Sequence, residues 1–300
     1  MQQGGHRDAE CTGIGNNYAS QNGILYSCDK KIAISGPAVN NPQFASGVHQ
    51  IAEGAFSYNT NLVKIVIPES VTTLGNSVFE ECTNLKSITL PSSLVSIGGS
   101  AFKNCAKLSA IVIPDNVSVL ENSTFYNCTG LKEVTLSKEL TTVGEQAFQN
   151  CAALTAIELP DGVMLIGEGA FSDCTSLTEI NIPADVSIIE ASTFSGCTGL
   201  ENVTFPEGLT YIKGNAFGNC TKLKNVKFPD SLTTIEYRAF HDCKSLTKVV
   251  LPENLTDIGM DIWGTSTTFE NCSSVYAVQI PKSLQKIAAV AFNSDISDVY

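Results

Sequence analysis

Large apolar residues return along most of the chain at a fixed interval of 23 residues. The interval is clearest for phenylalanine, which occupies positions Phe56, Phe79, Phe102, Phe125, Phe148, Phe171, Phe194, Phe217 and Phe240. Six inserted residues lengthen the next interval to 29, and the series closes at Phe269 and Phe292. Columns of Leu, Pro and Cys keep the same interval, so the chain is a tandem repeat.

Each unit combines two kinds of periodicity. The segment LTAIELP, residues 154–160, alternates apolar and polar positions, which predicts a strand with one buried face. Pro160 ends that strand because proline has no N–H to donate. The segment AFQNCAAL, residues 147–154, spaces its large residues three apart, which predicts one or two turns of α- or 3₁₀-helix. Recurrent Gly in IGEGAF and IGGSAF indicates turns in which glycine relieves backbone strain.

A unit of this length cannot bury its own apolar residues, so consecutive units must stack and cover one another. We therefore expect a right-handed repeat solenoid over residues 48–300, with a parallel β-sheet on one face and short helical or 3₁₀ turns on the other. The six-residue insertion falls within residues 259–268. Residues 1–47 precede the repeats as an irregular N-terminal segment.

The unit L-x-x-[IV]-x-[LIF]-P-x-x-[LV] resembles the leucine-rich repeat, and its continuation through A-F-x-x-C-x-x-L resembles the BspA-like subclass. The resemblance spans roughly residues 48–292 and implies that the parallel sheet lies on the concave face of the solenoid. It also implies that residues 22–37, NGILYSCDKKIAISGP, form a β-hairpin. BspA-like proteins of bacteria and protists are often surface-exposed and associated with adhesion to matrix proteins, other microbes or host cells.

Composition narrows the range of partners. Eighteen basic and thirty acidic residues give a net charge of −12, which disfavours nucleic acid and anionic membrane surfaces. The sequence has no apolar run of about 18 residues and no signal-peptide pattern at its N-terminus. If the protein is secreted or on the cell surface, its signal peptide and anchor are expected outside this sequence. The C-terminus lacks a polar cap, so we expect Tyr300 to mark a cut in a longer chain or an interface.

Nine of the eleven cysteines belong to the repeat, one in each unit from Cys82 to Cys272. Stacking gives these side chains parallel Cα–Cβ directions, which opposes disulfide geometry, and the sequence has no C-x-x-C pair. The pattern predicts a ladder of packed thiols, with an occasional redox or metal role as the alternative. Cys11 and Cys28 lie outside the column and can form a disulfide in an oxidising compartment.

An enzymatic function has little support in the sequence. The three histidines, His6, His49 and His241, have no partners at catalytic or metal-binding spacing. The sequence has no G-x-S-x-G, no H-E-x-x-H and no phosphate-binding glycine loop. Cys243 lies close to His241 but belongs to the buried column. We predict a non-enzymatic protein without catalytic residues, metal or cofactor.

Strand alternation assigns the outward residues of the concave face to the two positions that flank the second apolar residue of each strand. Glu133, Glu158 and Glu179 form an acidic strip in the middle of this face, and Lys227 and Lys248 form a basic strip further along. These five residues are candidate binding residues for a partner of complementary charge. The alternative is that they only solvate an exposed sheet.

The insertion carries Trp263, the only tryptophan of the chain. Loops that break a repeat project from it, so Trp263 is a further candidate as an interface anchor. The alternative is that Trp263 packs against the convex side. A Trp263→Ala protein that folds normally and keeps full partner binding would exclude the anchor role.

The solenoid surface, together with what the BspA-like resemblance implies, favours a recognition module, at the cell surface or secreted, that binds a protein or glycan on its concave face. The alternative is an intracellular scaffold for protein interactions, which the unpaired repeat cysteines tolerate equally well. A solenoid does not by itself specify its partner.

Overall fold

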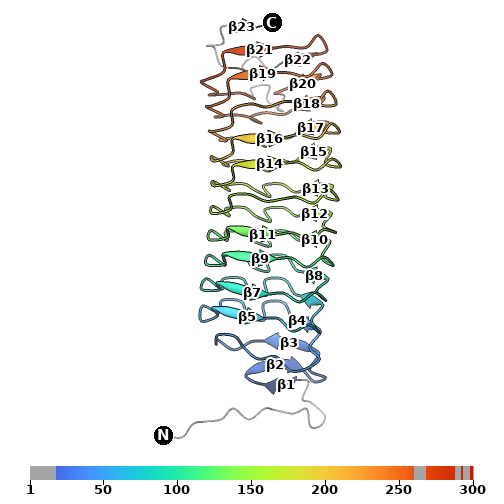
Figure 1. The fold of residues 1–300 in the computed structure, drawn as a ribbon, viewed down its shortest axis with the longest axis vertical. Helices are drawn as coiled ribbons and strands as arrows, with labels where there is room; N and C mark the ends of the chain where they lie inside the picture. Colours follow the sequence, from blue (N-terminus) through green and yellow to red (C-terminus); the bar gives the residue numbers. More distant parts are fainter. Residues whose placement is uncertain (1–17, 260–267, 288–291, 293–297, 300) are drawn as a thin grey trace.

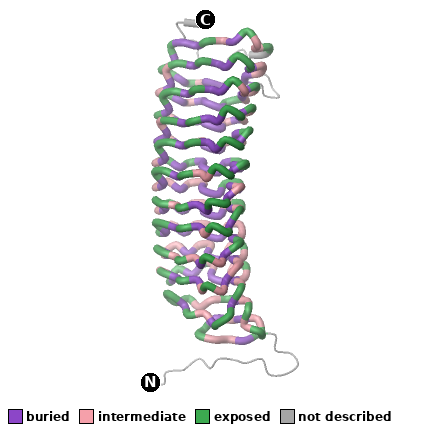
Figure 2. Tube along the Cα trace, turned by 45° about the vertical axis from the view of Figure 1, so that its right-hand side comes forward, coloured by how far each residue is buried: buried purple, intermediate pink, exposed green. Residues whose placement is uncertain are grey.

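The repeats stack into one elongated column, with the N-terminal strands at one end (Figure 1). This computed structural model describes residues 18–259, 268–287, 292 and 298–299. Residues that are 23 apart in the sequence lie side by side in successive coils, as Lys64 and Ser87 do. Buried and exposed positions alternate along every coil (Figure 2). The predicted repeat solenoid is confirmed.

Each coil contributes up to two short strands. The three-residue strands, with β23, form what we call the long-strand row, and all their pairings are parallel. Its members are β5 (Lys64–Val66), β7 (Ser87–Thr89), β9 (Ala110–Val112), β11 (Glu133–Thr135), β14 (Glu179–Asn181), β16 (Asn202–Thr204), β19 (Lys248–Val250), β21 (Ala277–Gln279) and β23 (Asp298–Val299). Hydrogen-bonded pairing joins β5 to β7, β9 to β11, β14 to β16, and β19 to β21 and β23.

The two-residue strands form a second, short-strand row on another side of the column (Figure 1). Its members are β4 (Gln50–Ile51), β6 (Thr73–Leu74), β8 (Ser96–Ile97), β10 (Val119–Leu120), β12 (Thr142–Val143), β13 (Leu165–Ile166), β15 (Ile188–Ile189), β17 (Tyr211–Ile212), β18 (Thr234–Ile235), β20 (Asp257–Ile258) and β22 (Lys286–Ile287). Each of these strands ends on the second residue of the later apolar pair of its unit, as β13 does on Ile166. Both strand rows therefore follow from the same repeat pattern.

Three antiparallel strands precede the first repeat: β1 (Tyr18–Gln21), β2 (Ile24–Ser27) and β3 (Ile32–Ser35). The two-residue turn between β1 and β2 is Asn22-Gly23, and both residues have positive φ, as a tight hairpin turn requires. Strand β3 pairs in parallel with β4, so the hairpin continues directly into the short-strand row.

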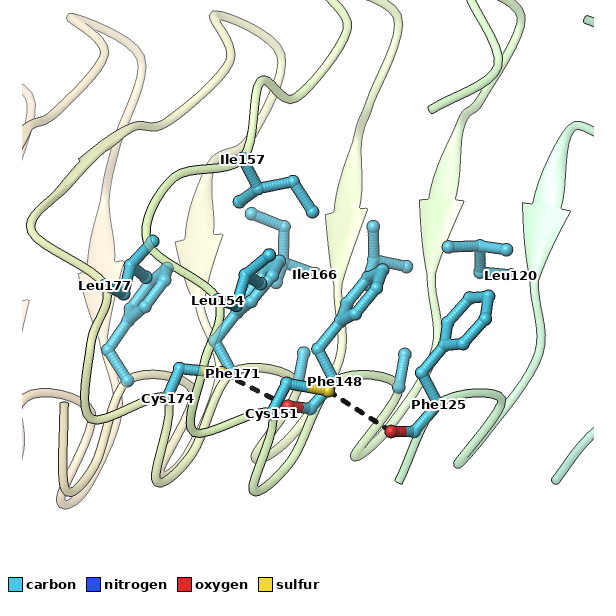
Figure 3. Close-up of a cluster of buried hydrophobic side chains, with 14 of the residues drawn as sticks. Leu120, Phe125, Phe148, Cys151, Leu154, Ile157, Ile166, Phe171, Cys174 and Leu177 are labelled. Atoms are coloured by element: carbon cyan, nitrogen blue, oxygen red, sulfur yellow. Dashed lines mark hydrogen bonds between the residues drawn. The ribbon is translucent and has the colours of Figure 1, made fainter. Parts of the chain in front are cut away.

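A continuous stack of phenylalanine rings runs through the core from Phe56 to Phe292. In its middle, the rings of Phe125 and Phe148 lie 5.3 Å apart between centroids, with an interplanar angle of 13°. Leu154, Ile157 and Ile166 pack beside this stack (Figure 3). Each ring is covered by its own copies in the neighbouring coils, so burial of the core depends on the stacking of units.

The expected helical or 3₁₀ turns are wrong, since the described residues contain no helix. Backbone amides explain the difference. Those of Gln146, Phe148 and Asn150 donate to carbonyls of the next coil at 2.9, 2.7 and 2.8 Å. The amides between them close turns within their own coil, as Gln149 does on the carbonyl of Gln146 at 3.1 Å. In a helix every backbone amide donates to a carbonyl of the same segment, whereas here alternate amides donate to carbonyls of the next coil.

Positive φ occurs twice per coil, two residues before and two residues after the Phe, as at Gln146 and Asn150. The recurrent Gly that precedes this segment has a different role from the one predicted. Gly167 has no positive φ, but a Cβ there would lie 2.6 Å from the backbone nitrogen of Glu145 in the previous coil. Gly167 therefore permits a close approach of two coils, and Gly169, with φ of +60°, is the residue in the strained conformation.

Substitution of Gly167 by Ala is expected to lower the free energy of unfolding by about 1–3 kcal/mol, because the new methyl group must displace backbone. The matched control is Gly162→Ala, because Gly162 has no positive φ and a Cβ there meets nothing closer than the carbonyl oxygen of Leu140 at 3.5 Å. Urea unfolding of both variants measures the difference. Equal losses would contradict the close-approach role of Gly167.

Candidate binding face

Outward-pointing side chains of the long-strand row make one exposed face along the column. Its positions are Lys64, Val66, Ser87, Thr89, Ala110, Val112, Glu133, Thr135, Ala156, Glu158, Glu179, Asn181, Asn202, Thr204, Asn225, Lys227, Lys248, Val250, Ala277 and Gln279. All of these side chains are exposed except Ala277, which is 6% exposed. We call this surface the strand face. Strand alternation therefore identified the exposed positions, and their binding role remains a prediction.

The charged candidates are free on this face. Glu133, Glu158 and Glu179 occupy three successive coils, and none forms an ion pair with another described residue. The same holds for Lys227 and Lys248 across the described ranges. Unpaired and exposed charges remain available to a partner, and they contribute little to the stability of the column.

Other charges close to the face are already paired. The Nζ atom of Lys224 lies 2.7 Å from a carboxylate oxygen of Glu201 in the preceding coil. This hydrogen bond holds the pKa of the Glu201 carboxyl below its ordinary value. A spacing of 23 residues places opposite charges side by side here, between the acidic strip and Lys227.

The long-strand row is interrupted where the strand was predicted from LTAIELP. Residues 155–159 form no strand, so that prediction is wrong for this coil, although the pattern holds in most others. The third residue of each three-residue strand is Val, Thr, Asn or Gln, whereas the equivalent residue in this coil is Glu158. The coil with Lys227 at that position has only isolated bridges at Asn225. Both of these coils carry a charged residue at this position, which no coil with a regular long strand does.

A hollow of about 820 Å³ opens beside the coil of Glu158, between β11 and residues 155–162. Glu133 and Glu158 both line it, together with Val134, Thr135 and Ile157. Lys132 and Lys138 also line it, so the acidic strip has basic neighbours that the sequence analysis overlooked. A smaller hollow of about 270 Å³ lies between β7 and β9. Glu179 lines neither hollow. Trp263 lies outside the described residues.

The repeat cysteines are core residues. All nine are free and buried, which confirms the predicted thiol ladder. Each thiol also donates to a Phe carbonyl of an adjacent coil, as Cys151 Sγ does to Phe125 O at 3.2 Å (Figure 3). Burial raises the pKa of Cys128 and Cys174 to about 12, so these thiols stay neutral at physiological pH. Neutral, inaccessible thiols are poor nucleophiles and poor metal ligands.

Cys28 is disulfide-bonded in the structure. Its expected partner, Cys11, lies outside the described residues. The N-terminal hairpin therefore carries a cysteine in a different chemical state from those of the repeat column.

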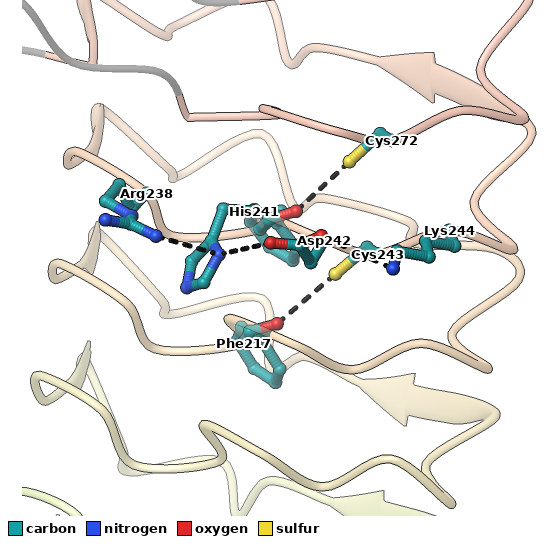
Figure 4. A network of polar contacts seen from close by, with 8 residues as sticks. Phe217, Arg238, His241, Asp242, Cys243, Lys244 and Cys272 are labelled. Atoms are coloured by element: carbon teal, nitrogen blue, oxygen red, sulfur yellow. Dashed lines mark hydrogen bonds and ion pairs between the residues drawn. The ribbon is translucent and has the colours of Figure 1, made fainter.

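His241 belongs to a polar network at one side of the column and not to a catalytic pair (Figure 4). Its Nδ1 lies 3.1 Å from Asp242 Oδ2 and 3.4 Å from Arg238 Nη2. Burial acts to raise the pKa of Asp242, but His241, Asn271 and Lys244 together outweigh it and the pKa is lowered. The Cys243 thiol instead donates to the carbonyl of Phe217 at 3.2 Å, and burial holds its pKa well above the ordinary value.

Within the described ranges, no group of three or more His, Cys, Asp or Glu side chains is placed to hold a metal ion. The described residues also contain no helix with the length and apolarity to cross a membrane.

The fold and its exposed strand face define a repeat solenoid of the protein-interaction class. The family model described as the BspA type leucine rich repeat region matches residues 49–178 and 164–297, so the chain belongs to that family. Leucine-rich repeats of this family act as interaction modules and are typically not enzymes. No curated protein sequence matches the chain.

Two solved structures share the fold. A leucine rich cell surface protein from Faecalibacterium prausnitzii is 24% identical, with a TM-score of 0.52 over 97% of this chain and 95% of its own. The pneumococcal vaccine antigen PcpA is 22% identical, with a TM-score of 0.55 over 91% of this chain and 83% of its own.

The thiol ladder predicts unfolding at alkaline pH. Below the ordinary thiol pKa of 9.0 both states are neutral, so stability is unaffected. As pH rises from about 9 towards 12, the unfolded chain ionises its thiols while the folded chain keeps them protonated, so stability falls. The double variant Cys128→Ala, Cys174→Ala should lower this slope by roughly 2.7 kcal/mol per pH unit, at about 1.36 for each thiol. Urea unfolding between pH 8 and 11 measures the change of the unfolding free energy with pH. The same slope in the variant and in the unchanged protein would contradict this prediction.

Proposed function

We propose that this protein is a non-enzymatic recognition module of the cell surface that binds a macromolecular partner through its strand face. The observation that carries the proposal is the set of exposed, unpaired charges on consecutive coils of one face. Ten coils at about 4.8 Å each give a face roughly 48 Å long. Such a length suits a protein segment or a glycan chain better than a metabolite.

The two charged strips of this face favour different chemical groups of a partner. The acidic strip of Glu133, Glu158 and Glu179 favours basic groups of a partner, and the basic strip of Lys227 and Lys248 favours acidic ones. Exposed charges of this kind set association rate and specificity more than affinity, so binding is expected to weaken as salt rises.

The disulfide of Cys28 supports the cell-surface location over the intracellular scaffold, because disulfides persist in oxidising compartments. The Faecalibacterium prausnitzii relative is described as a cell surface protein, which supports the same location. Protease treatment of intact cells of the source organism is expected to remove the protein. A protein that survives this treatment but is digested after lysis is the intracellular scaffold.

Binding to a panel of matrix proteins and glycans is expected to be lost or reduced at least tenfold when Glu133, Glu158 and Glu179 are changed to Gln. The matched control changes Glu121, Glu145 and Glu168 to Gln, since these residues are also exposed but lie outside the strand face. Surface plasmon resonance at low and high salt measures both variants. Equal losses in the two variants would indicate a net-charge effect and contradict a role for the face.

A further inference from the structure

We propose that the hollow between β11 and residues 155–162 binds an extended peptide segment with a basic side chain. This inference rests on the proposed function and names the partner chemistry of one part of the strand face. The first support is a stretch of backbone whose amides form no hydrogen bond. In the described part of the chain, residues 156–159 donate no backbone hydrogen bond.

On the opposite side of the hollow, the backbone after β11 also lacks a hydrogen bond to the next coil. Ile67, Ile113 and Ile182 each donate their amide to the next coil, at 3.0, 2.8 and 3.0 Å. Leu136 is the equivalent residue after β11, and it donates to no backbone carbonyl among the described residues, as is also true of Leu90 beside the smaller hollow. Two stretches of backbone thus border the larger hollow without pairing to each other. Unpaired strand edges are the surfaces to which an extended peptide adds by main-chain hydrogen bonds.

Charge around the hollow selects the side chains of such a peptide. Glu133, Glu158 and Asp161 line it, are exposed and form no ion pair with described residues. Lys132 and Lys138 also line it, and Lys138 is already 3.9 Å from Asp115 in an exposed pair. Three carboxylates against two lysines leave the lining net negative, which favours a Lys or Arg in the bound segment. A glycan would use the carboxylates but not the unpaired amides in a strand-like register.

The test uses an array of acetylated hexapeptides with Lys fixed at the third position and the other positions varied. The whole chain is expected to bind members of this array at least tenfold more tightly than a matched array with Glu at that position. Peptides N-methylated at alternate residues keep their side chains but lose main-chain donors, so their binding should be lost. Protection of the amides of residues 156–159 from hydrogen exchange should accompany binding.

Three single variants separate the contributions. Glu158→Gln removes the charge and should weaken binding several-fold. Glu158→Thr restores the residue type of strand-forming coils, so it should also close the row, raise the thermal midpoint and weaken binding at least tenfold further than Glu158→Gln. Glu168→Gln is the control, because Glu168 is exposed but lies outside the strand face and does not line the hollow.

The proposal is overturned if no Lys-centred peptide binds above its Glu-centred partner, or if Glu158→Thr binds as well as Glu158→Gln. Selective binding of a glycan, with no peptide bound, would also overturn it and make the hollow a sugar site. If no peptide binds in the hollow but a whole protein still binds to the strand face, only the proposed peptide site is excluded. Loss of both, without loss of fold, removes the proposed function itself.

Discussion

The distance between successive coils governs every other feature of this column. Parallel strand pairing fixes that distance at about 4.8 Å, so each side chain lies directly against its counterpart 23 residues away. A residue type is therefore acceptable in the core only if it packs against itself. Phe meets this condition by offset stacking, with centroids 5.0 to 5.6 Å apart along the ladder. Cys meets it because its thiol donates to a Phe carbonyl of an adjacent coil instead of facing another thiol.

The same condition applies to polar positions. Asn127 donates its side-chain amide to the oxygen of Asn104 at 2.7 Å, and Asn150 continues the ladder. These residues also adopt positive φ, which Asn tolerates better than most residues. Where like charges would stack, the sequence often alternates their sign, as in the pair of Lys213 with Glu190 at 2.6 Å. Self-complementarity of each column thus explains most of the repeat.

Sequence periodicity was enough to predict the solenoid, the buried columns and the outward positions of the strand face, because each depends on one unit repeated. It was not enough to predict the turn around Phe148, because spacing by three residues fits a helix as well as a turn whose alternate amides leave the coil. The role of Gly167 was hidden for a related reason, since it depends on the backbone of the previous coil. Strand β1 was overlooked, although Asn22-Gly23 is a strong hairpin signal. Trp263 and the insertion lie outside the described residues.

Residues at equivalent positions on the strand face need not pack against their own copies in neighbouring coils, because their side chains point into solvent. Their residues can therefore change from coil to coil without loss of the core, and Glu158 and Lys227 are the clearest changes. Both coincide with coils that lack a regular strand, whereas the Phe stack beneath them stays continuous. The core thus holds the column together where the sheet above it is interrupted. A local departure from strand-forming residues, tolerated at a small cost in stability, is typical of positions that serve recognition.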